Sequence, residues 1–185
     1  MNLNQCHSLP VDPQVRIGHI HLKVGNLQRA LDFYCGVLGF QLTQRYGTGA
    51  AFISAGGYHH HIALNTWESL GGSAPPPGTT GLYHLAILYP TRASLVDALK
   101  RLLEANIPLD GASDHGVSEA LYLRDPDDNG VELAWDRPSS LWPRTSDGEL
   151  AMFTHPLDLR DLLTQTPVAG AHEGAVETGF GPKDL

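Results

Sequence analysis

The sequence predicts an α+β protein in which two βαβββ modules form a curled mixed sheet around a cavity, with a C-terminal extension. Three observations support this. The order of strand and helix patterns in residues 15–66 recurs in residues 81–136. A Pro/Gly-rich linker, residues 67–80, separates the two copies. Hydrophobic residues make up 42% of the 185-residue chain, which is enough for one shared core.

The first module starts with a strand and a helix. Residues 16–24 alternate between two faces, which is the pattern of a strand. Residues 25–40 carry apolar side chains at helical spacing, with an N-cap at Asn26 and a stop at Gly39. Three short strands separated by glycine-containing turns are then expected, at residues 40–46, 50–56 and 59–65.

The second module repeats this order. Residues 81–90 are expected to form a strand, and residues 91–107 a helix with leucines on one face. The remaining expected elements are an extended piece at 108–110, a strand at 118–124, a turn at 125–130 and a strand at 131–135.

Two flanking segments complete the chain. Residues 1–14 are polar, contain two prolines and are expected to form an arm rather than a signal peptide. Residues 137–185 form the C-terminal extension, which carries apolar anchors up to about residue 165 and a short helix in 157–165. The last ~20 residues are rich in glycine and are expected to be mobile.

Composition excludes several classes of function. Twelve Lys and Arg against twenty Asp and Glu give a net charge of −8, which disfavours binding to nucleic acid or to an anionic membrane. No apolar run approaches the ~18 residues of a membrane span. Two cysteines do not make a disulfide framework, so we expect a reducing, cytoplasmic location.

The repeat superimposes residues that could bind a metal. It places His19 over His84, 65 positions apart, and Ala63 over Glu132, 69 positions apart. A single strand histidine is usually a surface residue, but two at the same place in both copies favour a metal site. Two imidazoles and one carboxylate leave three octahedral positions open, the arrangement of non-haem Fe(II) sites. His21 lies on the same strand face as His19 and competes with it as a ligand.

Two sequence blocks resemble a known superfamily. The first is GHIHLKV followed by NLxRALxFYxxVLGF, and the second is DPDDNGVEL. With the two βαβββ units, they are similar to the vicinal oxygen chelate superfamily over roughly residues 15–136. Its members include glyoxalase I, fosfomycin-resistance proteins, bleomycin-binding proteins and extradiol dioxygenases.

Three features favour the extradiol branch, most like catechol 2,3-dioxygenase. Ala63 stands where glyoxalase-like members carry a fourth ligand, a carboxylate. His60 stands where extradiol dioxygenases carry a non-ligand histidine, and strand alternation sends it to the face opposite His59 and His61. The run from His115 through Leu-Tyr122, Asp-Pro and Glu132 matches the extradiol signature, apart from a turn residue, Asp128.

The resemblance implies an activity and a set of roles. It implies Fe(II), or Mn(II) on the same donors, held by His19, His84 and Glu132, and a small aromatic diol cleaved with O2. His60 would act as acid–base catalyst, while Tyr122 and His115 would bind the substrate oxygen. A homodimer is expected, with the ligands supplied by one chain or by two.

Three alternatives remain open from the sequence. A glyoxalase-type isomerase is weakened by Ala63, and a fosfomycin-resistance-type transferase by the lack of a basic cluster for a phosphonate. A metal-free module of the bleomycin-binding type would not need His19, His84 and Glu132 together. Metal content separates this last class from the others.

Overall fold

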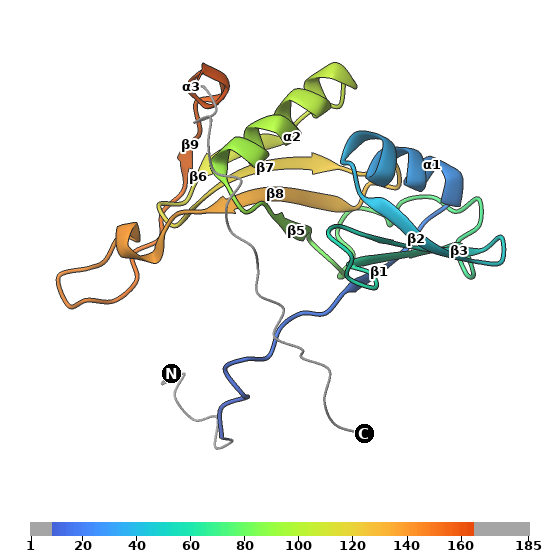
Figure 1. Ribbon diagram of the computed structural model, residues 1–185, viewed down its shortest axis with the longest axis horizontal. Helices are drawn as coiled ribbons and strands as arrows, with labels where there is room; N and C mark the ends of the chain where they lie inside the picture. The colour runs from blue at the N-terminus through green and yellow to red at the C-terminus, as the bar shows by residue number, and fades with distance from the viewer. Residues whose placement is uncertain (1–8, 165–185) are drawn as a thin grey trace, which may run out of the picture.

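A computed structural model of the chain describes residues 9–164 (Figure 1). The expected mobile tail lies outside these residues, as do the first eight residues of the expected arm. The first module contains β1 (Ile20–Lys23), α1 (Leu27–Leu31), a π-helix (Asp32–Val37), β2 (Gln41–Tyr46), β3 (Ala50–Ser54) and β4 (Ile62–Asn65). The second contains β5 (Leu85–Leu88), α2 (Arg92–Glu104), β6 (Gly111–Asp114), β7 (Ser118–Arg124) and β8 (Gly130–Asp136). A 3-10 turn (Ser139–Leu141), β9 (His155–Pro156) and α3 (Leu159–Thr164) follow.

Each module builds one mixed sheet, and the two sheets have the same order. The first runs β1-β4-β3-β2, and the second β5-β8-β7-β6-β9. In both, the first strand pairs parallel with the last strand of its module, and the other pairs are antiparallel. The α+β class and the repeated order predicted from the sequence are therefore confirmed.

The first helix departs from the expected regular helix. Asn26 caps it as predicted, because its side-chain oxygen accepts the Arg29 amide at 3.0 Å. After Leu31 the hydrogen-bonding pattern widens into a π-helix, which ends before Gly39 at a φ of 88°. The second helix starts with a capping box between Thr91 and Ser94.

One hydrophobic core joins the two modules. Figure 1 shows α1 and α2 on the same side of the two sheets. Tyr34 and Leu31 of the first module belong to the same buried cluster as Leu99 and Leu133 of the second. Leu162 of α3 is also fully buried in this cluster, so the extension packs on the core. Neither sheet has to bury its apolar face alone.

Several expected strands are shorter in the structure, and two strands, β6 and β9, were not expected as strands. The extended piece expected at 108–110 is a true strand, β6, that starts at Gly111. The extension adds β9 to the edge of the second sheet, with Asp114 opposite His155. The two residues of β9 are too few to show strand periodicity in the sequence. No helix in residues 9–164 is long and apolar enough to cross a bilayer.

Candidate functional site

An imidazole and a carboxylate meet at the start of the second sheet. His84 directly precedes β5, and Glu132 lies on β8, which pairs parallel with β5 and places Ala86 opposite Glu132. His84 Nε2 lies 2.9 Å from Glu132 Oε2, with the side chains 33% and 13% exposed. This pair consists of two of the three metal ligands predicted from the sequence.

Tyr122 and His115 extend the pair along the same sheet. Tyr122 is directly opposite Glu132 in the β7–β8 ladder, and its hydroxyl lies 3.3 Å from Glu132 Oε1. His115 Nε2 lies 2.7 Å from the same hydroxyl. Burial, and then the nearby Glu132 carboxylate, raise the pKa of Tyr122 to about 12. The phenol therefore keeps its proton at neutral pH and can donate a hydrogen bond.

His84, His115 and Tyr122 line a cavity of about 410 Å³. The rest of the wall includes Ser113 and Thr154, which supply hydroxyl groups. This cavity is roomy enough for a small aromatic molecule, and three of its lining side chains carry hydrogen-bonding groups from the predicted site.

His19 stands apart from this cluster. It precedes β1, lies exposed, and packs against His60 with the ring centroids 4.4 Å apart. His19 and His84 both line a groove of about 580 Å³ between the two modules, so they face a common space. Within residues 9–164, no three His, Cys, Asp or Glu side chains gather closely enough to hold a metal ion. The structure thus brings together Glu132 and one of the two predicted histidine ligands. Two imidazoles and a carboxylate remain donors that suit a divalent transition metal.

The expectation that His60 faces away from its neighbours is wrong. The three histidines precede β4, which begins at Ile62, so strand alternation does not apply to them. His59 Nδ1 lies 2.7 Å from His60 Nδ1. Burial, and then the neighbouring His19, lower the pKa of His60, which favours a neutral imidazole.

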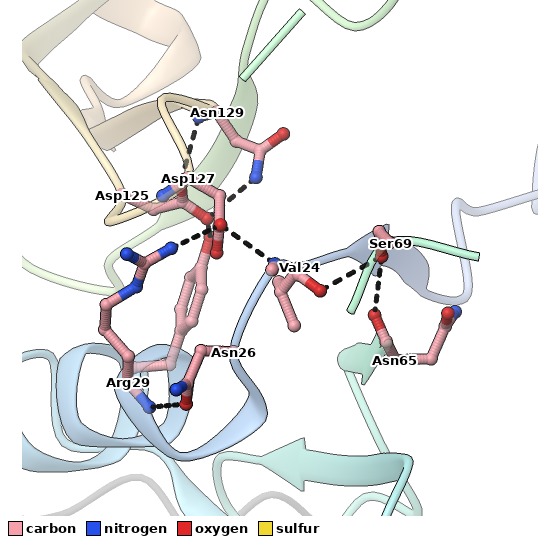
Figure 2. A network of polar contacts seen from close by, with 10 residues as sticks. Val24, Asn26, Arg29, Asn65, Ser69, Asp125, Asp127 and Asn129 are labelled. Atoms are coloured by element: carbon pink, nitrogen blue, oxygen red, sulfur yellow. Dashed lines mark hydrogen bonds and ion pairs between the residues drawn. The ribbon is translucent and has the colours of Figure 1, made fainter. Parts of the chain in front are cut away.

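A polar network that the sequence did not reveal joins the two modules (Figure 2). Asp127, in the β7–β8 turn, accepts the Gly25 amide at 2.9 Å and Arg29 Nη2 at 2.6 Å through one oxygen. Asp125 of the same turn accepts the Tyr34 hydroxyl at 3.0 Å. The sequence pattern predicts only a turn at residues 125–130. Its contacts with the first helix join residues about 90 to 100 positions apart, which no local pattern indicates. The network holds the corner between β1, which His19 precedes, and α1 against the turn that leads into β8, the strand of Glu132.

Comparisons with known proteins agree with this architecture. The catechol-2,3-dioxygenase of Bacillus subtilis (strain 168) is 40% identical over 156 residues, covering 84% of this chain and 53% of the relative. The biphenyl-2,3-diol 1,2-dioxygenase 3 of Rhodococcus globerulus is 34% identical, covering 65% of this chain and 63% of the relative. The chain thus spans between half and two thirds of the length of these curated relatives.

A solved structure shows the fold independently. The crystal structure of a glyoxalase/dioxygenase from Nostoc punctiforme superimposes with a TM-score of 0.58 at 21% identity. It covers 71% of this chain and 98% of the other. A family profile matches residues 16–133, which include both modules almost entirely. The chain belongs to the Glyoxalase/Bleomycin resistance protein/Dioxygenase superfamily.

Proposed function

We propose that the protein is an extradiol dioxygenase that cleaves the ring of a catechol beside its two hydroxyl groups. The observation that carries this proposal is the hydrogen-bonded cluster of His84, Glu132, Tyr122 and His115 beside a cavity of about 410 Å³. It supplies a ligand pair and a donor for substrate oxygen in one place. The 40% identity with a catechol-2,3-dioxygenase supports the same reaction.

His19, His84 and Glu132 would hold the metal ion, and Fe(II) or Mn(II) suits these donors. When bound, the metal supplies the redox chemistry between the diol and dioxygen. Glu132 is only 13% exposed, and its contact with His84 keeps both side chains directed at one point. A half-buried carboxylate in this position favours a cation beside it.

The other side chains would handle the substrate and its protons. Tyr122 donates a hydrogen bond to a substrate oxygen, since its raised pKa keeps the phenol protonated. His115 holds the Tyr122 hydroxyl at 2.7 Å. His60, whose lowered pKa favours the neutral form, would take a proton from the diol and return it to an oxygen of the ring-opened product. Both oxygen atoms of O2 end in the product, a hydroxy-semialdehyde, so no external reductant is required.

Oxygen uptake tests the proposal directly. The full chain is loaded anaerobically with Fe(II), given catechol and then substituted catechols, and oxygen consumption and the yellow ring-opened product are followed. Controls are the metal-free chain and Glu132→Gln. Uptake that depends on both iron and Glu132 is expected. Absence of uptake across the panel, with iron confirmed bound, would overturn the proposal in favour of an isomerase or transferase.

A homodimer stays a prediction, which light scattering tests.

A further inference from the structure

We propose that the C-terminal extension positions the active site by fixing the tautomer of His115. The main-chain carbonyl of Phe153 would hold the imidazole proton on Nδ1, so that Nε2 accepts a hydrogen bond from Tyr122. This inference rests on the proposed function, because it gives the extension a part in that site. Phe153 and Thr154 are positioning residues, since they act through His115.

The contacts of His115 Nδ1 establish which nitrogen carries the proton. This atom lies 3.1 Å from the Phe153 carbonyl oxygen and 3.2 Å from Thr154 Oγ1. A carbonyl oxygen only accepts hydrogen bonds, so Nδ1 must be the donor. A neutral imidazole has one N–H group, and the bond made by one ring nitrogen determines the state of the other. Nε2 is therefore the acceptor, directed at the Tyr122 hydroxyl 2.7 Å away.

This assignment decides where the Tyr122 proton goes. The hydroxyl has one hydrogen and two neighbouring acceptors, His115 Nε2 at 2.7 Å and Glu132 Oε1 at 3.3 Å. In the chain without substrate, Nε2 accepts the hydrogen through the shorter contact, and a bound substrate oxygen would take it over from Nε2. The Glu132 carboxylate then keeps its acceptor capacity for His84 and for a cation. With the opposite tautomer, Nε2–H would donate to Tyr122 and direct the phenol proton at Glu132.

The extension is built to hold the Phe153 carbonyl in place. The Phe153 amide donates back to the His115 carbonyl at 3.3 Å, and β9 continues on the edge of β6. Gly116 has a φ of 76°, and a Cβ there would lie 2.6 Å from the Phe153 ring and 2.8 Å from Pro143. Glycine is needed both for its conformation and for this close approach. Phe153 is thus packed directly on the residue after His115.

Gly116→Ala is the test variant and Gly148→Ala is its matched control. Both glycines lie in the left-handed region, at φ values of 76° and 85°, so alanine is strained at both. A Cβ at Gly148 meets nothing within 4 Å, whereas at Gly116 it displaces Phe153. The comparison separates backbone strain from loss of the Phe153 contact.

The first readout is the imidazole tautomer, from ¹⁵N NMR of the metal-free full-length chain. Wild type and Gly148→Ala are expected to carry the His115 proton on Nδ1, and Gly116→Ala to gain the Nε2–H form. Thr154→Val is expected to keep Nδ1–H, because the carbonyl suffices. The inference would be overturned if the wild-type His115 carried its proton on Nε2. It would also be overturned if folded Gly116→Ala kept the wild-type tautomer, or if Thr154→Val lost the proton from Nδ1. The wild-type and Thr154→Val measurements do not depend on Gly116→Ala folding.

The second readout is turnover of catechol by the iron-loaded chain. Displacing a positioning contact costs on the order of 10- to 100-fold in kcat. Gly116→Ala is expected to show this loss with KM nearly unchanged, and Gly148→Ala to match wild type. An equal loss in both glycine variants would overturn the inference. If wild type carries the His115 proton on Nδ1 but the iron-loaded chain cleaves no ring, the proposed function fails and the tautomer assignment stands. The two can be told apart because the tautomer is measured without turnover.

Discussion

Removing one hydroxyl group, in Tyr34→Phe, tests the contact that joins the two modules. Tyr34 is fully buried in the first module, and its hydroxyl donates to Asp125 Oδ2 at 3.0 Å. Asp125 is 4% exposed and also accepts from the Asp127 amide and from the amide and side chain of Asn129, each at 2.9 Å. The substitution leaves the ring in place, so the loss of packing is small.

The expected cost follows from the charge and burial of the acceptor. Burial, and then the Asp125 carboxylate, raise the pKa of Tyr34, so the phenol stays protonated and donates. A hydrogen bond to a charged group contributes about 1.5–3 kcal/mol. Asp125 keeps three other donors, which favours the lower half of that range. A chain of this size loses about 2–4 °C of Tm per kcal/mol, so we expect a fall of about 3–9 °C.

Urea unfolding followed by circular dichroism measures this loss. Tyr46→Phe is the control, because Tyr46 is 66% exposed on β2 and its variant should unfold like wild type. Tyr34→Phe should lower the urea midpoint with an unchanged m-value. A loss below about 0.5 kcal/mol, within the range of ordinary surface substitutions, would refute the argument that this bond fastens the modules.

Three further predictions concern the site and its surroundings. His60→Ala should keep iron but lose turnover by about 10²- to 10⁴-fold, measured by oxygen uptake, and a wild-type rate would exclude an acid–base role. Glu132→Gln should lower iron affinity at least about 10-fold in chelator competition, and Tyr122→Phe should lower it less, because only Glu132 would be a ligand; equal losses would contradict these assignments. Burial of Asp114 opposes ionisation, but the Gly116 amide and Arg137 outweigh it and lower the pKa of this carboxyl. The ionised Asp114 therefore stabilises the folded chain fully above the usual carboxyl pKa of about 4. This stabilisation is lost as the pH falls through the lower pKa that Asp114 has in the folded state. Asp114→Asn should be less stable at neutral pH and closer to wild type in strong acid, and a pH-independent difference in urea midpoint would argue against this linkage.

Local patterns predicted the parts of the fold that local physics determines. Alternation indicated the strands that bury one face, Asn26 indicated a helix start, and the repeat indicated the two sheets. The π-helix after Leu31 was missed, since its apolar spacing satisfies an ordinary helix equally well. β9 was missed because its two residues pair through the main chain with β6.

The candidate site was predictable to the extent that one sheet carries it. Tyr122 and Glu132 lie on neighbouring strands and His84 directly precedes the next strand, so their proximity follows from the pairing that the repeat predicts. The structure places the three in one cluster of polar contacts. The Phe153 carbonyl could not be predicted, because every residue has one and only the folded chain places this one on His115. The Asp127–Arg29 ion pair is similarly invisible, because its partners lie 98 positions apart.

The division of the site between the modules explains why the contacts around it matter. Glu132 and His84 belong to the second sheet, whereas His19 precedes β1 of the first and faces the groove that His84 also lines. No strand pairing joins β1 to β5 among residues 9–164, so backbone hydrogen bonds do not fix the separation of the two histidines. The shared core and the Asp125 and Asp127 contacts fix it instead. A small change in this packing alters the distance between His19 and Glu132 while leaving each sheet intact. If His19, His84 and Glu132 hold the metal as proposed, its affinity would depend on a turn that supplies none of these ligands.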